Sequence, residues 1–269
     1  HFRANGYRAI GSGKIYHGGF PDAQSWDDYF PNQTRNVPPQ PKLAEPLPMN
    51  GIPRTAHFDW GPIANPDTEM SDYQVVDWVS KQLSEAQKQP LFLACGFTKP
   101  HLPWYIPKKY FDQFPLSSIK LPPYRKDDLG DVPAAGVKMA KPDGDHRKVV
   151  EFGQWEKAVQ SYLAAISFMD GQLGRVMRAL ETGPNANNTA VVLWSDHGWH
   201  LGEKSHWRKF SLWEESTRSV LMMNIPGVTK PGGRCSRAVN LLGIYPTLCE
   251  THGLSKPAAL EGTSFVAQL

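Results

Sequence analysis

The stretch that most constrains this chain runs from residue 190 to residue 213, where an uncharged run gives way to a loop crowded with ionisable groups. Residues 190–194 (AVVLW) are apolar and rich in β-branched side chains, which predicts a short buried strand. Asp196 and His197 follow directly. In open α/β sheets, ligands bind just beyond the carboxyl ends of the strands. A carboxylate beside an imidazole suits a metal ion there, although Asp-His-Gly equally makes a simple turn.

Two earlier strands are also expected to end in basic side chains. Residues 7–10 predict a strand that leads into Lys14 and His17, with glycine at positions 11, 13, 18 and 19. Residues 91–97 predict a second buried strand, followed by His101 between two prolines that favour an extended segment. Lysine suits anions and histidine can donate a proton to a leaving group. Taken singly, the first segment also reads as a glycine-rich turn and His101 as a structural histidine.

Helices separate these strands. Apolar side chains recur at helical spacing over residues 71–88 and 152–181, and a third helix is expected over 239–252. Residues 219–225 predict a further strand. Strands that alternate with helices indicate an α/β fold with a mostly parallel or mixed sheet, covered by helices.

We expect one domain over residues 1–269, interrupted by two excursions. Residues 31–66 hold nine of the 24 prolines, and residues 105–149 are rich in proline, lysine and aspartate without periodicity. Proline excludes regular helix and central strand from much of the first excursion. Such long loops shape a substrate cleft or simply wrap the surface. The chain begins at His1 as if in mid-domain, which predicts a fragment.

Bulk properties exclude several classes of function. The net charge is only +3, without a basic run, which argues against a nucleic-acid partner. No stretch approaches the roughly 20 apolar residues that span a bilayer. Cys95 is expected to be a buried thiol, and Cys235 and Cys249 are free to pair or not. Oligomeric state is not readable from these features.

The three strand ends together are more informative than each alone. They deliver Lys14 and His17, then His101, then the Asp196–Lys209 segment to one rim. A metal ion, two lysines and several histidines suit a tetrahedral oxyanion such as sulfate or phosphate, because they stabilise the charge that develops during its displacement.

The chain resembles the formylglycine-dependent sulfatases, nearest the iduronate-2-sulfatase-like branch. The residues that carry the resemblance span nearly the whole chain: 13–17 (GKIYH), 99–104 (KPHLPW), 195–203 (SDHGWHLGE), 207–209 (WRK), 212–215 (LWEE) and 244–248 (IYPTL). The resemblance implies an alkaline-phosphatase-like sulfatase fold, truncated at both ends and without the C-terminal subdomain. It also implies a secreted or periplasmic enzyme in bacteria, or a lysosomal one in animals.

The resemblance implies a role for each matching residue. Asp196 and His197 match ligands of one active-site calcium ion. Lys14 and His17 match the pair that positions the hydrated formylglycine and the sulfate. His101 and Lys209 match groups on the sulfate and its bridging oxygen, where one protonates the leaving alcohol. The expected activity is hydrolysis of sulfate esters, with a sulfated glycan as substrate. Trp199, Glu203 and His206 lie nearby in sequence without an assigned role.

The chain also departs from the family pattern. The nucleophile of these enzymes sits in a C-x-P-S-R motif, which none of the three cysteines has. The formylglycine and the N-terminal aspartate pair are therefore expected outside residues 1–269, and the chain alone is expected to be inactive. Two alternatives stay open: a phosphodiesterase or phosphatase of the same superfamily, against which residues 207–209 argue, and an inactive relative that binds sulfated glycans.

Overall fold

The computed structural model describes residues 1–17 and 19–269, and it contains several small sheets packed against long helices. Three strands form a parallel sheet in the order β2-β1-β4: β1 (Arg8–Gly13), β2 (Asp28–Phe30) and β4 (Leu91–Gly96). A second parallel pair joins β3 (Trp60–Ile63) to β5 (Trp104–Pro107). The α/β class expected from the sequence is therefore present.

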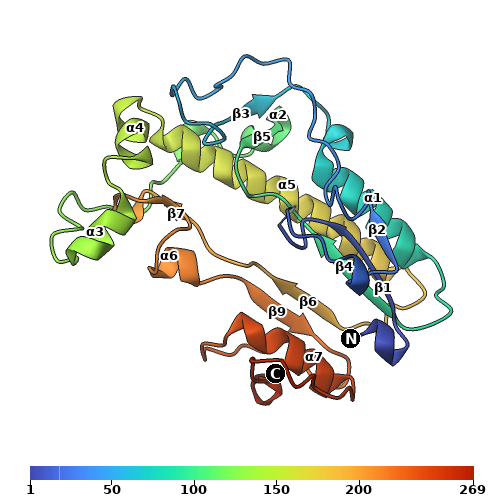
Figure 1. Ribbon diagram of the computed structural model, residues 1–269. Coiled ribbons are helices and arrows are strands. Elements are labelled where there is room, and N and C mark those ends of the chain that lie inside the picture. The colour runs from blue at the N-terminus through green and yellow to red at the C-terminus, as the bar shows by residue number, and fades with distance from the viewer. Residues whose placement is uncertain (18) are drawn as a thin grey trace.

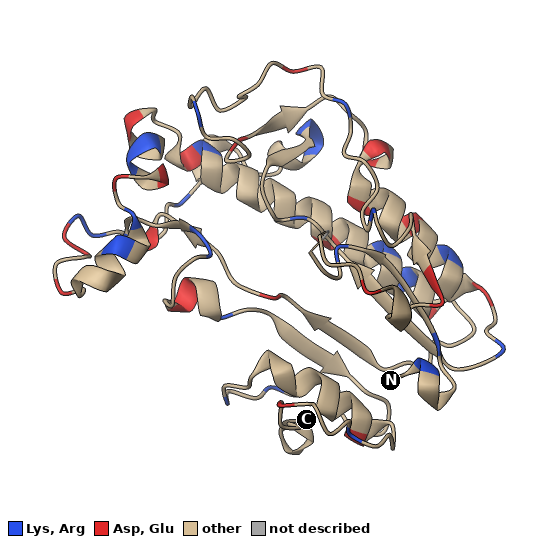
Figure 2. Cartoon of the chain, viewed as in Figure 1, with Lys and Arg blue, Asp and Glu red and all other residues tan. Residues whose placement is uncertain are grey.

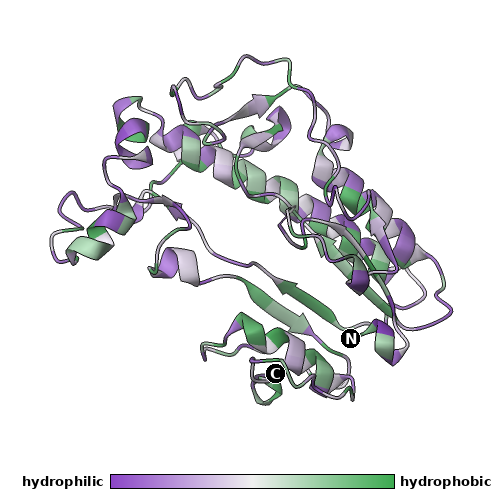
Figure 3. Cartoon of the chain, viewed as in Figure 1, coloured by the Kyte–Doolittle hydropathy of each residue, from purple (hydrophilic) through white to green (hydrophobic). Residues whose placement is uncertain are grey.

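Two further strand pairs are antiparallel. Strand β6 (Val191–Trp194) pairs with β9 (Leu221–Asn224), and β7 (His200–Leu201) forms a short hairpin with β8 (Trp207–Arg208). Strands β6 and β9 carry no charged side chain and stand out as strongly hydrophobic (Figures 2 and 3). The expectation that residues 190–194 form a fully buried strand is wrong, since Trp194 is 49% exposed. Strand β4 is likewise only half-buried over most of its length, because β1 is its sole partner among the described residues.

The helices follow the apolar periodicity closely. They are α1 (Ser71–Ser84), α2 (Lys108–Phe111), α3 (Ala134–Ala140), α4 (Asp145–Glu151), α5 (Trp155–Glu181), α6 (Glu214–Thr217) and α7 (Ile244–Thr251). Helix α5 packs along α1, which in turn covers β1 and β4 (Figure 1). Helices α3 and α4 lie in the second excursion, where the sequence showed no periodicity. Both have seven residues, which is too short for a periodic signal to emerge.

The first excursion is mostly irregular, with β3 near its end. It is nevertheless anchored, because Asp59 accepts hydrogen bonds from the backbone N–H groups of Met49 (2.9 Å) and Asn50 (2.8 Å) and from the Tyr105 hydroxyl (2.6 Å). A buried carboxylate with several donors is a stable arrangement in a loop that lacks a backbone ladder.

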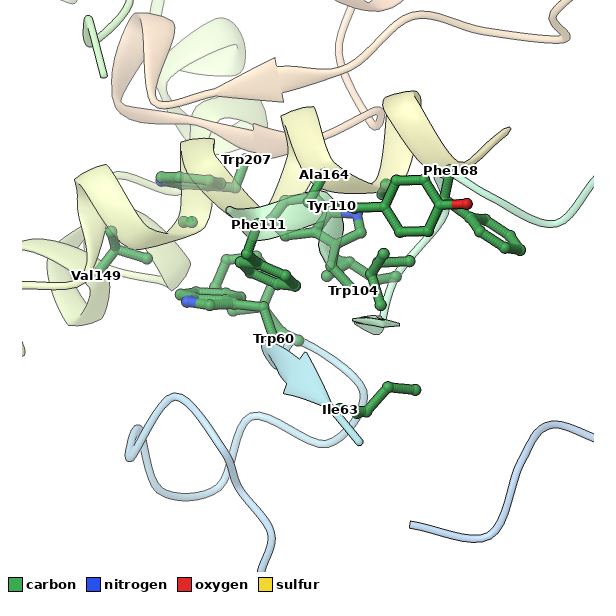
Figure 4. Packing of buried hydrophobic residues seen from close by; sticks show 14 of the residues in the cluster. Trp60, Ile63, Trp104, Tyr110, Phe111, Val149, Ala164, Phe168 and Trp207 are labelled. Carbon is green, nitrogen blue, oxygen red and sulfur yellow. The ribbon is translucent and has the colours of Figure 1, made fainter. Parts of the chain in front are cut away.

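One aromatic core joins the excursion to the helices. Trp60, Trp104, Phe168 and Trp207 belong to one buried cluster, supplied by β3, β5, α5 and β8 (Figure 4). Trp60 and Trp207 are stacked with ring centroids 6.4 Å apart. Full burial of one such side chain contributes about 1.5–3 kcal/mol. This core fixes the hairpin β7–β8 against the excursion.

Two further expectations concerned the state of the cysteines and the presence of a membrane-spanning helix. All three cysteines are free thiols: Cys249 is buried and Cys235 is exposed. Cys95, expected to be buried, is only partly buried, and desolvation still raises the pKa of its thiol to about 12. Cys235 and Cys249 are thus unpaired. Among residues 1–17 and 19–269, no helix combines the length and apolar character that crossing a bilayer requires.

Candidate active site

Strands β1 and β4 end side by side, and this places Lys14 at the rim. Their parallel register sets Gly13 opposite Gly96, and the Lys14 N–H donates to the Gly96 carbonyl at 2.8 Å. Gly13 has φ +82°, and a Cβ there would lie 2.0 Å from the Gly96 oxygen. A Cβ on Gly96 would lie 2.3 Å from the Lys14 carbonyl carbon. Only glycine at both positions permits this approach of the two backbones. Gly18, also noted in the sequence, lies outside the described residues.

The loop after β4 is held from helix α1. The buried carboxylate of Asp72, in the first turn of α1, accepts hydrogen bonds from the backbone N–H groups of Thr98 (2.9 Å) and Lys99 (2.8 Å). The buried Lys99 ammonium donates to the Pro103 carbonyl at 2.5 Å. Burial lowers the pKa of Lys99 to about 8, against the opposing effect of Asp72. The loop is therefore closed by two sets of hydrogen bonds, with His101 at its centre.

His101 presents one free ring nitrogen. Its Nδ1 lies 2.7 Å from the Leu102 carbonyl, which can only accept, so Nδ1 carries the proton. Nε2 is then the nitrogen available to a substrate. Burial lowers the pKa of His101, the Leu102 hydrogen bond opposes this, and the positive charges of Lys209 and Lys14 lower it further.

His197 and Lys209 are in direct contact. His197 follows β6 and donates from Nδ1 to the Gly198 carbonyl at 2.7 Å, so its Nε2 lone pair accepts a hydrogen bond from the Lys209 ammonium at 2.8 Å. Lys209 follows β8 at the end of the β7–β8 hairpin. Asp196 Oδ1 lies 3.5 Å from His197 Nε2, and the Asp196 side chain is 81% exposed. Burial lowers the pKa of Lys209, which Asp196 opposes and Lys14 reinforces.

These contacts bring most of the sequence-predicted residues together. Lys14 and Lys209 are both close enough to His101 to lower its pKa. The Trp199 ring lies 5.7 Å from the His101 ring and 6.0 Å from the His197 ring. His17 stands apart, because it is exposed and its nearest ring is Phe20 at 6.3 Å. In the described part of the chain, no hydrogen bond or ion pair joins the His17 side chain to the other site residues.

Asp196 and His197 fit a metal ion as two ligands of a larger set. Asp196 Oδ1 and His197 Nε2 lie 3.5 Å apart, close enough to share one ion. The Lys209 ammonium now occupies the lone pair of His197 Nε2, where a metal ion would bind. Calcium takes six to eight ligands, mainly oxygen. Within residues 1–17 and 19–269, no group of three or more histidine, cysteine or carboxylate side chains is arranged to hold a metal. Coordination by His197 would require Lys209 to leave Nε2.

Two residues without an assigned role have structural ones. The Glu203 carboxylate accepts a hydrogen bond from the Leu201 N–H at 2.7 Å and so closes the β7–β8 turn. The buried His206 donates from Nδ1 to the Ala140 carbonyl at 2.8 Å. His57 was not predicted as a site residue, and its ring lies 6.4 Å from that of His101. It occurs in the proline-rich excursion, where no sequence pattern distinguishes it.

Comparison with known proteins decides the family. The sulfatase family model matches residues 2–254. The chain belongs to the sulfatase family. This sulfatase chain is 39% identical over 280 residues to a sulfatase from Formosa agariphila, covering 100% of this chain and 54% of that protein. It is 28% identical over 317 residues to human iduronate 2-sulfatase, with 100% and 56% coverage. The sulfatase chain thus spans about half the length of these relatives.

Solved structures agree on the fold. A protein bound to its substrate D-glucosamine-2-N,6-O-disulfate superimposes with a TM-score of 0.70 at 17% identity, covering 99% of this sulfatase chain and 62% of that one. A phosphonate monoester hydrolase from Agrobacterium radiobacter gives 0.69 at 22% identity, with 100% and 60% coverage. The sulfatase chain therefore has the alkaline-phosphatase-like α/β fold. Sulfatases of this family generally use calcium and formylglycine.

Proposed function

We propose that this chain forms part of the catalytic domain of an enzyme that hydrolyses sulfate esters of sulfated glycans. The observation that carries the proposal is the meeting of Lys14, His101 and Lys209 beside Asp196 and His197, at the ends of β1, β4, β6 and β8. Several positive and proton-donating groups in one place suit a sulfate group. The relatives named as sulfatases support the same reaction.

Each residue has a proposed part in this reaction. Lys14 and Lys209 bind the sulfate oxygens and stabilise their negative charge. His17, which stands apart from them in this structure, would join them by a movement of the loop that it shares with Lys14. His101 holds a proton on Nε2 and gives it to the bridging oxygen as the alcohol leaves. Its lowered pKa makes the protonated ring a stronger acid, and a bound sulfate anion favours protonation by its charge.

Asp196 and His197 are proposed to supply two ligands to one calcium ion, with Lys209 moving from His197 to the sulfate. A calcium ion held there would supply positive charge beside the sulfate, and formylglycine is the nucleophile in this family. We place the formylglycine outside residues 1–269, because no cysteine here has its motif. A secreted, periplasmic or lysosomal location is proposed from the family alone.

The role of His101 is tested by two substrates in the full-length enzyme. His101→Ala should reduce sulfate release from a sulfated sugar about 10²–10⁴-fold, because a sugar alkoxide leaves poorly without a proton. Release from 4-nitrophenyl sulfate should fall much less, because nitrophenolate is a good leaving group. His252→Ala, beside α7, serves as a matched histidine control.

Three results would count against these assignments. Equal losses on both substrates would remove His101 from the role of acid. Hydrolysis of phosphate or phosphonate esters in place of sulfate esters would favour the related phosphoesterase chemistry. Sulfated sugars that bind without being hydrolysed would indicate the inactive glycan-binding alternative.

A further inference from the structure

The first excursion places an exposed histidine at the rim of the candidate site. The His57 ring lies 6.4 Å from the His101 ring, and the two planes are inclined by only 20°. His57 belongs to neither the sheet nor the long helices, and its proximity contributes to the lowered pKa of His101. The imidazole therefore extends the group of positive and proton-donating side chains in one direction, toward the excursion.

The position of His57 is set by its neighbours in the chain. Phe58 is fully buried against Trp60 and Trp207, with ring centroids 5.0 and 5.7 Å apart. The Phe58 N–H donates to the Thr55 carbonyl at 2.9 Å, which closes the turn that carries His57. Because Phe58 is fixed in the core, the backbone of the adjacent His57 is held at the rim of the site.

The turn also adopts a backbone conformation that residues with side chains rarely take. Arg54 and Ala56 have φ of +57° and +49°. Such left-handed residues are strained and persist where the surrounding structure enforces them, commonly at ligand sites. Here the buried Phe58 and Asp59 enforce the turn, and the turn holds His57 toward His101.

The charge around His57 is positive. Arg54 is exposed, and within residues 1–17 and 19–269 neither Arg54 nor His57 forms a salt bridge with a carboxylate. Asp59, the nearest carboxylate to His57 in the sequence, is buried and accepts hydrogen bonds from a backbone N–H and from the Tyr105 hydroxyl. The excursion beside His57 therefore offers hydrogen-bond donors and the positive charge of Arg54.

We propose that His57 is a specificity-determining residue, which binds a second anionic substituent, sulfate or carboxylate, on the sugar that carries the reacting sulfate ester. This inference rests on the proposed function. Its basis is geometric, because the centres of the His57 and His101 rings lie 6.4 Å apart. A sugar whose sulfate lies between His101 and Lys209 would therefore bring a neighbouring substituent to His57.

Two sugars separate this role from sulfate binding in general. N-acetylglucosamine-6-O-sulfate has one anionic group and glucosamine-2-N,6-O-disulfate has two. Binding to the 269-residue chain is measured by calorimetry and by the ring-proton NMR signals of His57 and His101. The wild-type chain should bind the disulfated sugar about tenfold more tightly, the size of one charge-assisted hydrogen bond. The His57 signals should move only with the disulfated sugar.

Variants then assign the preference to His57. In His57→Ala the ratio of the two affinities should fall to about one, and His57→Lys, which supplies a cationic hydrogen-bond donor, should restore part of it. Gln40→Ala, an exposed position of the same excursion, should keep the wild-type ratio. Thermal unfolding of each variant checks that the fold is intact.

The binding measurements separate a failure of the His57 role from a failure of the sulfate site. If the wild-type chain binds both sugars equally, or if His57→Ala keeps the preference, the role of His57 is overturned while the sulfate site stands. If the wild-type chain binds neither sugar, the proposed sulfate site fails, and the inference about His57 fails with it.

Discussion

His200 shows how burial of a single residue supports the site. It is fully buried, its Nδ1 lies 3.3 Å from the Glu203 carbonyl, and its Nε2 lies 2.7 Å from the Ser211 hydroxyl. His200 Nε2 is thus hydrogen-bonded to the Ser211 hydroxyl, which donates its own proton to the Ser216 hydroxyl at 2.9 Å. Ser211 lies two residues after Lys209. A neutral His200 therefore ties the β7–β8 hairpin to the segment that carries Lys209.

The buried His200 should make the fold sensitive to acid. Burial, assisted by the neighbouring His206, lowers the pKa of His200 to about 4. Between this value and the ordinary histidine pKa of about 6.5, the unfolded chain binds more protons than the folded one. The free energy of unfolding should therefore fall as the pH drops through this window, by up to about 3 kcal/mol. His200→Gln should remove this part of the loss, measured by urea unfolding at neutral and acidic pH.

Ser211→Ala provides the control for this pH effect. The variant loses the hydrogen bond to His200, so its stability should drop by about 1 kcal/mol at neutral pH. It keeps the buried imidazole, so its acid sensitivity should remain. If His200→Gln loses stability with acid as steeply as the wild-type chain, His200 is not a source of the effect.

At the scale of secondary-structure elements, the pairing of β1 with β4 determines where Lys14 and His101 emerge. The parallel register aligns the two carboxyl ends, and Gly13 and Gly96 allow the chains to cross closely there. Helix α1 then fixes the outgoing loop through Asp72. Two strands and one helix thus position Lys14 and His101.

Gly96→Ala should disturb this crossing. The added methyl group would lie 2.3 Å from the Lys14 carbonyl carbon, a backbone atom that cannot move aside alone. We expect a loss of about 1–3 kcal/mol in the free energy of unfolding, measured in urea, and weaker binding of sulfate.

Gly171→Ala is the matched glycine substitution. Gly171 is exposed on α5, and a methyl group there meets only the Tyr110 hydroxyl at 4.0 Å. The variant should gain up to about 1 kcal/mol, because alanine favours helix over glycine. A Gly96→Ala protein as stable as the wild-type chain would show that the crossing tolerates a side chain.

At the scale of the whole molecule, the aromatic cluster connects the segments that carry the site. Trp207 follows the hairpin loop just before Lys209, and it packs on Phe58 and Trp60, which follow His57 in the excursion. Helix α5 supplies the other wall through Phe168 (Figure 4). The positions of Lys209 and His57 therefore depend on one shared core.

Phe168→Ala should weaken this core as a unit. Phe168 is fully buried, and its ring contacts Tyr110 edge-on at 5.5 Å. Truncation of a buried phenylalanine costs about 3–5 kcal/mol, which urea unfolding would detect. The exposed neighbour Asp170→Ala should change stability by less than about 0.5 kcal/mol. A loss below about 1 kcal/mol for Phe168→Ala would show that the cluster is not a continuous core.

Much of the element plan was predictable because it depends on local patterns. The long helix predicted at 152–181 is α5 (Trp155–Glu181), and the helix predicted at 71–88 is α1 (Ser71–Ser84). Strands near 7–10, 91–97, 190–194 and 219–225 are all present. The burial of β4 and β6 was overestimated, because an apolar run reports a tendency to be covered and not the presence of a covering partner.

The sequence by itself determined the class of fold, the order of its elements, and the motif residues that point to sulfatase chemistry, because periodicity, glycine and proline act on near neighbours in the chain. Only the tertiary structure decided that Lys209 contacts His197, that His17 stands apart, and that His57 lies beside His101. These relations join residues separated by 12 to 44 positions. They depend on strand register, a buried carboxylate and an aromatic core, whose energies arise only when distant segments pack together.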